Sequence, residues 1–442
     1  MSPSSTPGRV ASVVLTAVLT LAASLLAATP AQAANRVTPG SFTGYGFDQC
    51  VAPTQAKMDA WLTSSPYWAV GIYIAGDNRY CGDDLQVNLD STWVASQLRK
   101  GWRLLPITVG RQASCSSVAR YEDRRISADP TRSYAKAREQ GRIEARDTVR
   151  AARALGITVG STLWYDLEHF TGGDRCRDSA LSFLSAWTVK LHALGYRSGV
   201  YSSGSSGIRA LDDARVLSPR RYAMPDQVWV AEWNGRADVS SSYLRPDGWM
   251  PHARVHQYRG DHTERYGGVS ITIDSNYLDL GRGSVAPREG RHCGGVDVSK
   301  SHYRRLVRGD QGAMVKVVQC LLREKRLYRG DLRFTYTRKT ARAVKRFQAT
   351  RSLPVNSRTN ARTWTALLAE GPAPLVKVGS ASHAVRRAQR ALNAATSARL
   401  DVTGLFDAAT TRAVRTYQRD RGLRATGVLA ADTWSQLKRG LS

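Results

Sequence analysis

The stretch Ser161-Thr162-Leu163-Trp164-Tyr165-Asp166-Leu167-Glu168 decides how the larger part of this chain is expected to fold. It is a short β-rich run that ends in two acidic residues, which is typical of a buried strand. Helical patterns flank it on both sides, at 135–155 and 180–194. The same alternation of a short strand and a helix continues outward in both directions from this stretch.

Eight strands are expected in all. Their positions are 45–48, 69–74, 103–109, 161–168, 198–202, 228–233, 254–258 and 270–276. Expected helices fall between most of them, at 55–64, 92–99, 135–155, 180–194 and 206–213. Eight strands with interleaved helices predict the α/β class and a (β/α)₈ TIM-like barrel over residues 42–284. A doubly wound open sheet is the alternative.

The C-terminal third contains a repeat with an offset of seventy residues. Gly309, Val315 and Gln319 return as Gly379, Val385 and Gln389, and two further blocks return at the same offset: Thr340-Ala-Arg-Ala-Val344-Lys-Arg-Phe347-Gln348 as Thr410-Thr-Arg-Ala-Val414-Arg-Thr-Tyr417-Gln418, and Thr363-Trp364 as Thr433-Trp434. A constant offset across separate blocks indicates a duplicated module. Apolar stripes at helical spacing predict two small all-α three-helix domains, at 293–370 and 374–440, and these stripes are core rather than ligand contacts.

Residues 1–33 have the pattern of a cleaved export signal. Arg9 supplies the positive end, an apolar run follows at 10–28, and Ala31-Gln32-Ala33 is a small-x-small cleavage site. A membrane anchor is the alternative, but the run stops at Pro30 without a basic flank. We therefore expect a mature chain from about Ala34 that is secreted and has no membrane span, because no other stretch approaches 18 apolar residues.

The six cysteines of an exported chain predict three disulfides. Cys293 and Cys320 bracket the start of the first repeat, so we expect them to pair. Three connectivities stay open for the remaining four: Cys50, Cys81, Cys115 and Cys176. No cysteine or histidine spacing suggests zinc, and we expect neither a metal nor a cofactor.

The net charge of +28 is concentrated near the C-terminus. From Cys293 onward, 30 Lys and Arg stand against 9 Asp and Glu, a net +21. Such a field favours binding to a polyanion, which outside a cell would be an anionic wall polymer. The alternative is a solvated basic surface that aids solubility. A physiological nucleic-acid partner is not expected, because no stacking or groove-reading module accompanies the charge.

Acidic residues stand at the C-terminal ends of four expected strands, where a (β/α)₈ barrel has its catalytic mouth. They are Asp48, the pair Asp166 and Glu168, Glu232 and Asp274. Alternation along a strand sends Asp166 and Glu168 to the same side, about 7 Å apart. Two like charges this close in a screened cavity raise the proton affinity of one, as needed to protonate a glycosidic oxygen. Helix capping or pairing with arginine is the alternative for each acid.

Polar and aromatic residues near these acids complete the expected substrate-binding set. Trp164, Tyr201, Trp233 and Tyr258 are candidates to stack on sugar faces. Glu232, Gln257 and Asn276 are the polar members of this set.

The barrel motifs resemble the family 25 glycoside hydrolases, lysozyme-type muramidases, and more closely a related glycoside-hydrolase-like domain of unknown function. The residues that carry the resemblance are Gly46-Phe47-Asp48, Val70-Gly71-Ile72-Tyr73-Ile74, Tyr165-Asp166-Leu167-Glu168, Gly199-Val200-Tyr201-Ser202, His256-Gln257-Tyr258 and Ile273-Asp274-Ser275-Asn276-Tyr277. The resemblance implies that Asp48, Asp166 and Asp274 line the site and that Glu168 is the proton donor. Two departures are Cys50, where muramidases usually have Ser, and Glu232-Trp233, where they commonly have an uncharged segment.

Each C-terminal repeat resembles the peptidoglycan-binding-like domain found on many exported wall hydrolases. In that family a glycine usually occupies the turn before the last helix. The second repeat has Gly427 there and the first has Ser357, so a left-handed turn at that point would be strained in the first repeat.

Two functions follow. The first is a monomeric, cell-wall-associated hydrolase that cuts peptidoglycan or a related wall glycan, with Glu168 as general acid and the repeats holding it on peptidoglycan or anionic wall polymers. The second is a catalytically inactive wall-binding or scaffolding protein with a hydrolase-like barrel. We place the hydrolase first.

Overall fold

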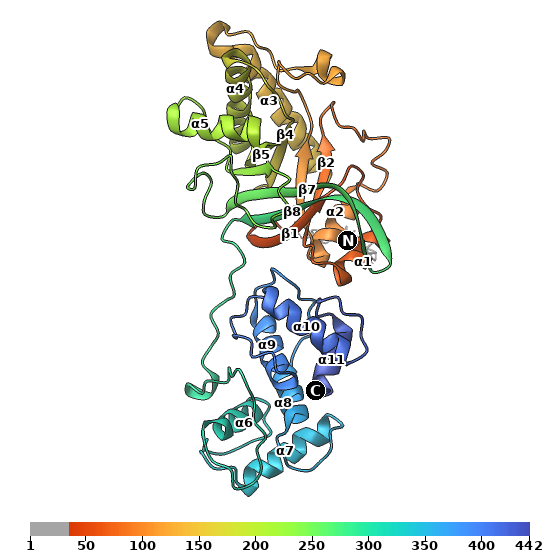
Figure 1. The fold of residues 1–442 in the computed structure, drawn as a ribbon, viewed down its shortest axis with the longest axis vertical. Helices are drawn as coiled ribbons and strands as arrows, with labels where there is room; N and C mark the ends of the chain where they lie inside the picture. Colours follow the sequence, from red (N-terminus) through yellow and green to blue (C-terminus); the bar gives the residue numbers. More distant parts are fainter. Residues whose placement is uncertain (1–34) are drawn as a thin grey trace, which may run out of the picture. The chain divides into compact units, whose positions relative to one another are not determined.

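Residues 35–442 are described by a computed structural model, and the expected export signal at 1–33 lies outside them. Eight strands form a closed barrel in chain order (Figure 1). Their bounds are β1 Phe42–Asp48, β2 Ala69–Ala75, β3 Arg103–Thr108, β4 Thr162–Leu167, β5 Arg197–Ser203, β6 Gln227–Ala231, β7 Ala253–Tyr266 and β8 Val269–Leu280. Among the described residues, no helix combines the length and apolarity that crossing a membrane requires.

One α-helix follows each of the first five strands. The helices are α1 Gln55–Ser64, α2 Ser91–Lys100, α3 Thr131–Ala154, α4 Asp174–Ala193 and α5 Arg209–Leu217. The side chain of Asp90 caps α2 by accepting from the backbone N–H of Trp93. Helices α3 and α4 pack side by side, and Gly141 allows this because a Cβ there would lie 2.3 Å from the Phe183 carbonyl oxygen (Figure 1).

The last strand differs from a regular (β/α)₈ arrangement. Each strand from β1 to β6 pairs in parallel with the next one along the chain, whereas β8 is antiparallel to both β7 and β1. Within residues 35–442 no α-helix separates β6 from β7 or β7 from β8. The barrel is confirmed and the open sheet is excluded, but Asp274 lies inside β8 and not at its C-terminal end as expected. A tight hairpin joins β7 to β8, and this reverses the direction of β8.

The barrel interior below the mouth is aromatic. Trp164 is fully buried and meets Trp229 edge-on, with ring centroids 5.6 Å apart. Gly199 makes room for it, because a Cβ there would lie 2.4 Å from the Trp164 ring. Trp164 is therefore a core residue, and its expected role in stacking on sugars is wrong: it shares the inward face of β4 with Asp166 but lies one layer deeper.

All six cysteines are paired, as Cys50–Cys81, Cys115–Cys176 and Cys293–Cys320. The expected third pair is confirmed, and the structure selects one of the three connectivities left open for the others. The first bond joins the segments that follow β1 and β2. The second joins the segment that follows β3 to the start of α4. Both therefore brace loops at the C-terminal ends of parallel strands.

Each repeat consists of three helices, as expected. They are α6 Ala313–Glu324, α7 Arg338–Thr350 and α8 Ala361–Ala369 in the first, and α9 His383–Ala395, α10 Ala408–Asp420 and α11 Ala431–Lys438 in the second. The repeated glutamines are buried and hold turns: Gln348 accepts from the backbone N–H of Ser357, and Gln418 accepts from that of Gly427. Ser357 has φ +57° and Gly427 has φ +76°, so the first repeat keeps the left-handed turn with a non-glycine residue.

Candidate active site

A cavity of about 400 Å³ opens at the C-terminal ends of the parallel strands. We call it the acidic cavity because Asp48, Asp166, Glu168 and Asp274 all line it. These are the four acids that the sequence places at the mouth, and they come from β1, β4 with the residue after it, and β8. The structure therefore brings together side chains that lie more than two hundred positions apart.

Asp48 is 2% exposed and accepts hydrogen bonds on both carboxylate oxygens. Asn276 Nδ2 donates to Oδ1 at 2.6 Å, and the Tyr73 hydroxyl donates to Oδ2 at 3.3 Å. Gly71 on the neighbouring strand leaves room for Asp48, because a Cβ there would lie 2.5 Å from that of Asp48. Burial first, and then the charge of Asp274, raise the pKa of Asp48 to about 7.

Asp166 and Glu168 form the second part of the cluster. Asp166 is 4% exposed, and its Oδ1 makes no hydrogen bond with any residue of the described range 35–442. Gln112 fixes the backbone of the pair, since it donates to the Asp166 carbonyl oxygen at 2.9 Å and accepts from the Glu168 N–H at 2.8 Å. Burial raises the pKa of Asp166 well above its usual range, and the charge of Glu168 adds to the effect.

Glu168 is half-buried, so it is more accessible than Asp166. Burial raises the pKa of Glu168, and the Arg120 guanidinium opposes this rise. Arg120 lines the same cavity, and its Nη2 is held by the Asn78 carbonyl oxygen at 2.8 Å. The result is a carboxyl group that keeps a proton to a higher pH than an exposed glutamate and still faces the cavity.

Asp274 completes the acidic cavity from β8. Its carboxylate accepts from the backbone N–H of Asp261 and from Gln257 Nε2 at 3.2 Å. Burial raises the pKa of Asp274. Gln257 Nε2 also lies 3.4 Å from Asp48 Oδ1, so one amide links the carboxylates of β1 and β8.

The residues expected to bind substrate fall into three groups. Gln257 and Asn276 are buried and hold the carboxylates rather than line the acidic cavity. Tyr201 and Trp233 line a second cavity, described below, and both donate to Gln257 Oε1, at 3.1 Å and 2.9 Å. Tyr258 lines neither cavity, and burial raises the pKa of its hydroxyl.

Glu232 lines the second cavity, but its carboxylate is used locally. Ser242 Oγ donates to Glu232 Oε1 at 2.8 Å, and the Ser242 N–H donates to Oε2 at 3.2 Å. Burial alone raises the pKa of Glu232, but hydrogen bonds from Ser241 and Ser242 outweigh it and lower the pKa. The Glu232 carboxylate is thus ionised, and the hydrogen bonds that it accepts join the start of the segment after β6 to Ser242 in the same segment.

The second cavity has a volume of about 560 Å³. We call it the aromatic cavity because Tyr201, Trp233 and Tyr243 line it, together with Glu168. Glu168 is the one residue of the described chain that lines both cavities. The carboxyl group suited to proton donation therefore stands where the two cavities meet.

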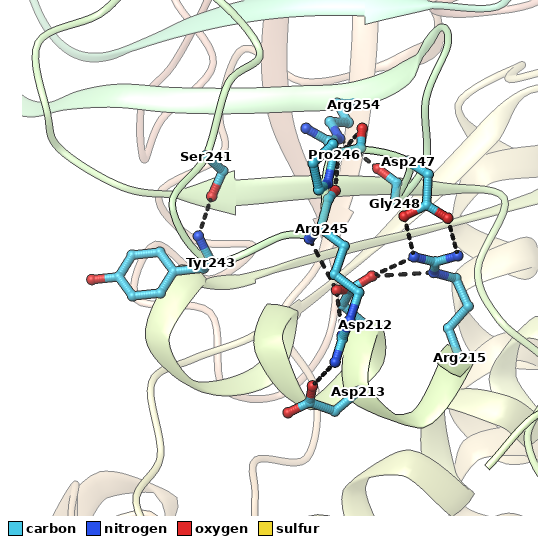
Figure 2. Close-up of polar contacts among 10 residues, drawn as sticks. All are labelled: Asp212, Asp213, Arg215, Ser241, Tyr243, Arg245, Pro246, Asp247, Gly248 and Arg254. Atoms are coloured by element: carbon cyan, nitrogen blue, oxygen red, sulfur yellow. Dashed lines mark hydrogen bonds and ion pairs between the residues drawn. The ribbon is translucent and has the colours of Figure 1, made fainter. Parts of the chain in front are cut away.

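The segment between β6 and β7 supplies Glu232, Trp233, Asn234 and Tyr243 to the lining of the aromatic cavity. Ion pairs fix this segment to α5 (Figure 2). Buried Asp212 accepts from Arg215 at 2.9 Å and from Arg245 at 2.7 Å. Arg215 also binds Asp247, and buried Arg254 donates to the Gly248 carbonyl oxygen at 2.6 Å. In Figure 2 the Tyr243 side chain points away from this cluster.

Three residues of the site were not among the predicted site residues: Tyr73, Gln112 and Arg120. Tyr73 is part of an ordinary buried strand pattern, and the other two lie in the long segment after β3.

Within residues 35–442 the one group of acidic, cysteine or histidine side chains close enough to hold a metal ion is Cys293, Cys320 and Glu324. Both of its sulfurs are in a disulfide.

Fold and site together define a glycoside-hydrolase-like barrel followed by two small helical domains. Residues 59–278 match the family described as Rv2525c-like, glycoside hydrolase-like domain. Residues 311–367 and 382–437 each match the peptidoglycan binding domain family. The chain therefore carries an Rv2525c-like, glycoside hydrolase-like domain and two peptidoglycan-binding domains, as the resemblance implied.

Three solved structures are similar to part of this chain at low sequence identity. An uncharacterized B. stearothermophilus protein is 18% identical, with 53% of this chain and 95% of that chain covered and a TM-score of 0.33. The Mycobacterium tuberculosis Tat-secreted protein Rv2525c in complex with L-tartrate is 12% identical, with 53% and 95% covered and a TM-score of 0.36. The catalytic domain of endolysin ply40 from bacteriophage P40 of Listeria monocytogenes is 14% identical, with 53% and 93% covered and a TM-score of 0.31. No curated protein matches the chain significantly.

Proposed function

We propose that this protein hydrolyses a cell-wall glycan, with Glu168 as the general acid. One observation carries the proposal: Glu168, whose pKa is raised by burial, shares the acidic cavity with Asp48, Asp166 and Asp274. Glycoside cleavage needs a protonated carboxyl at the leaving oxygen and negative charge beside the sugar that becomes cationic. The acidic cavity supplies both.

The reaction would proceed as follows. Glu168 gives its proton to the glycosidic oxygen, the bond from the anomeric carbon to that oxygen breaks, and the electron pair stays on the leaving sugar. Ionised carboxylates in the acidic cavity stabilise the positive charge on the ring. Water then adds to the anomeric carbon, and its proton passes to a carboxylate of the cluster. Hydrolysis should weaken as pH rises through the raised pKa of Glu168, because the donor must be protonated.

The two peptidoglycan-binding domains support a wall glycan as the substrate and a place at the cell wall. Their net charge of +21 from Cys293 onward would add attraction to anionic wall polymers. Holding the barrel on an insoluble polymer raises its effective concentration at each bond. Three disulfides fit an oxidising compartment outside the cell, so we propose a secreted, wall-associated monomer.

Reducing-sugar release from purified peptidoglycan tests the proposal. We expect Glu168→Gln to lower the rate by about a hundredfold or more, because a positioned proton donor contributes roughly 10²–10⁴-fold. Glu122→Gln is the matched control, since Glu122 is exposed and lines neither cavity. Equal release by the parent chain and by Glu168→Gln would refute the assignment of the acid. Retention on the wall without any release between pH 4 and 8 would favour the binding or scaffolding protein.

A further inference from the structure

Trp233 forms a fixed platform beside the acidic cavity. Trp233 is 66% exposed, which is unusual for a tryptophan, and it lines the aromatic cavity. Its indole N–H is held by Gln257 Oε1 at 2.9 Å. One side of the ring rests on Gly260, where a Cβ would lie 2.3 Å from the ring. The ring is therefore already held in place before any ligand arrives, which limits the entropy lost on binding.

Tyr243 lines the same cavity, and it too is fixed. Its ring packs on Gly204, where a Cβ would lie 2.2 Å from the ring, and the Arg209 guanidinium lies 5.1 Å from the ring centroid. The ion-pair cluster around Asp212 holds the backbone that carries Tyr243 (Figure 2). The aromatic cavity is thus a built surface and does not depend on a mobile loop.

The position of Glu168 determines which sugar of the glycan would lie in the aromatic cavity. The proton donor must touch the glycosidic oxygen, so the bond that breaks lies where the two cavities meet. The ring that becomes cationic belongs beside Asp48, Asp166 and Asp274, in the acidic cavity. The ring that leaves must then lie on the other side of Glu168.

We propose that the aromatic cavity is the binding site for the leaving-group sugar, with the exposed indole of Trp233 stacked on the C–H face of that pyranose ring. This assignment rests on the proposed function for its direction along the glycan. The ligand class is a neutral pyranose face, because the carboxylate of Glu232 in this cavity is already occupied by Ser242. An aromatic ring against the C–H face of a sugar buries apolar area on both partners.

Residue-resolved oxidative footprinting tests the site without requiring turnover. The full mature chain carrying Glu168→Gln is exposed to hydroxyl radicals with and without a soluble peptidoglycan glycan tetrasaccharide. We expect oxidation of Trp233 to fall about threefold or more when a sugar covers the ring. Met250 is the internal control, because it lies in the same segment, is 41% exposed and lines neither cavity. Its oxidation should not change.

Kinetics supply the second readout. We compare kcat/KM for the tetrasaccharide with that for a glycosyl fluoride, which has no leaving-group sugar. Trp233→Ala should lower the ratio of the two values by about tenfold, as expected for loss of an aromatic anchor. Trp233→Phe keeps a stacking ring without the N–H and should retain most of the ratio.

The outcomes separate the two proposals. If Trp233 is protected but the parent chain does not hydrolyse the glycan, sugar binding at Trp233 is supported and the proposed function is refuted. Hydrolysis by the parent chain without protection of Trp233 keeps the proposed function and overturns the sugar site. An unchanged ratio in Trp233→Ala, with both substrates slowed alike, would show that Trp233 acts through Gln257 on the carboxylates, which also overturns the site.

Discussion

Replacing Asp48 by asparagine should stabilise the barrel at neutral and alkaline pH. The asparagine can keep the contacts of Asp48, because its side-chain oxygen can still accept from Asn276, and the Tyr73 hydroxyl can accept where it now donates. What the substitution removes is a buried negative charge that faces Asp274. Removing a buried negative charge relieves its desolvation cost.

The pKa of Asp48 sets the size and sign of this gain. Its folded-state pKa of about 7 lies above the value of about 3.9 for an exposed aspartate. The folded state therefore binds this proton more tightly than the unfolded state. The contribution of Asp48 to the free energy of unfolding is greatest below about pH 3.9 and is lost as pH rises to about 7. The difference corresponds to roughly 4 kcal/mol at most, and coupling to Asp274 makes it smaller.

Urea unfolding of the mature chain at pH 3 and pH 8 provides the assay. Asp48→Asn should match the parent chain at pH 3 and exceed it by a few kcal/mol at pH 8. Asp84→Asn is the control, because Asp84 is exposed and should change stability little at either pH. A gain that is the same at both pH values, or a loss at pH 8, would refute the view that Asp48 is a buried carboxyl held away from its ordinary titration.

Three further substitutions test other parts of the structure. Asp212→Asn should lower the free energy of unfolding by roughly 3 kcal/mol at pH 7, because it leaves the charges of Arg215 and Arg245 without their buried partner. In the parent chain the pKa of Asp212 is lowered, so the stabilisation that Asp212 provides should be lost as pH falls through that lowered pKa. Replacing Cys115 and Cys176 by alanine should cost about 2–4 kcal/mol in urea unfolding, because the bond spans 61 positions. Ser357→Gly should stabilise the first repeat by roughly 0.5–1 kcal/mol in calorimetry, because relief of the left-handed strain exceeds the added chain entropy.

Much of the site could be predicted because it follows a rule of barrel geometry. The C-terminal ends of parallel strands meet at one mouth, so Asp48, Asp166 and Glu168 could be placed together from strand patterns alone. The repeats could be predicted because their cores recur at a constant offset. Trp233 could be named because it is an aromatic residue at the C-terminal end of the expected strand 228–233.

The rest depends on contacts that leave no local pattern. Tyr73 reaches Asp48 only because β1 and β2 pair in one register, with Phe47 opposite Val70. Gln112 holds the backbone of Asp166 from a segment whose path no periodicity describes. The disulfides between the remaining four cysteines required the positions of the loops. The prediction that Trp164 stacks on sugars was wrong because alternation along a strand gives the face on which a side chain lies but not its depth along the barrel axis.

Burial is the larger cause of the raised pKa of Asp48, and the direction of β8 adds the charge of Asp274 to it. In the antiparallel pair of β1 and β8, Asp48 lies directly opposite Asp274. Side chains opposite each other in such a pair have Cβ atoms about 5 Å apart, and like charges there repel. A residue at a strand end could relieve that repulsion by moving its loop, but Asp274 lies within a strand that is paired on both sides, with β1 and with β7. The backbone therefore holds the two carboxyls close together, so the charge of Asp274 adds to the burial that favours a bound proton on Asp48. Asp48→Asn would make this uncharged state permanent.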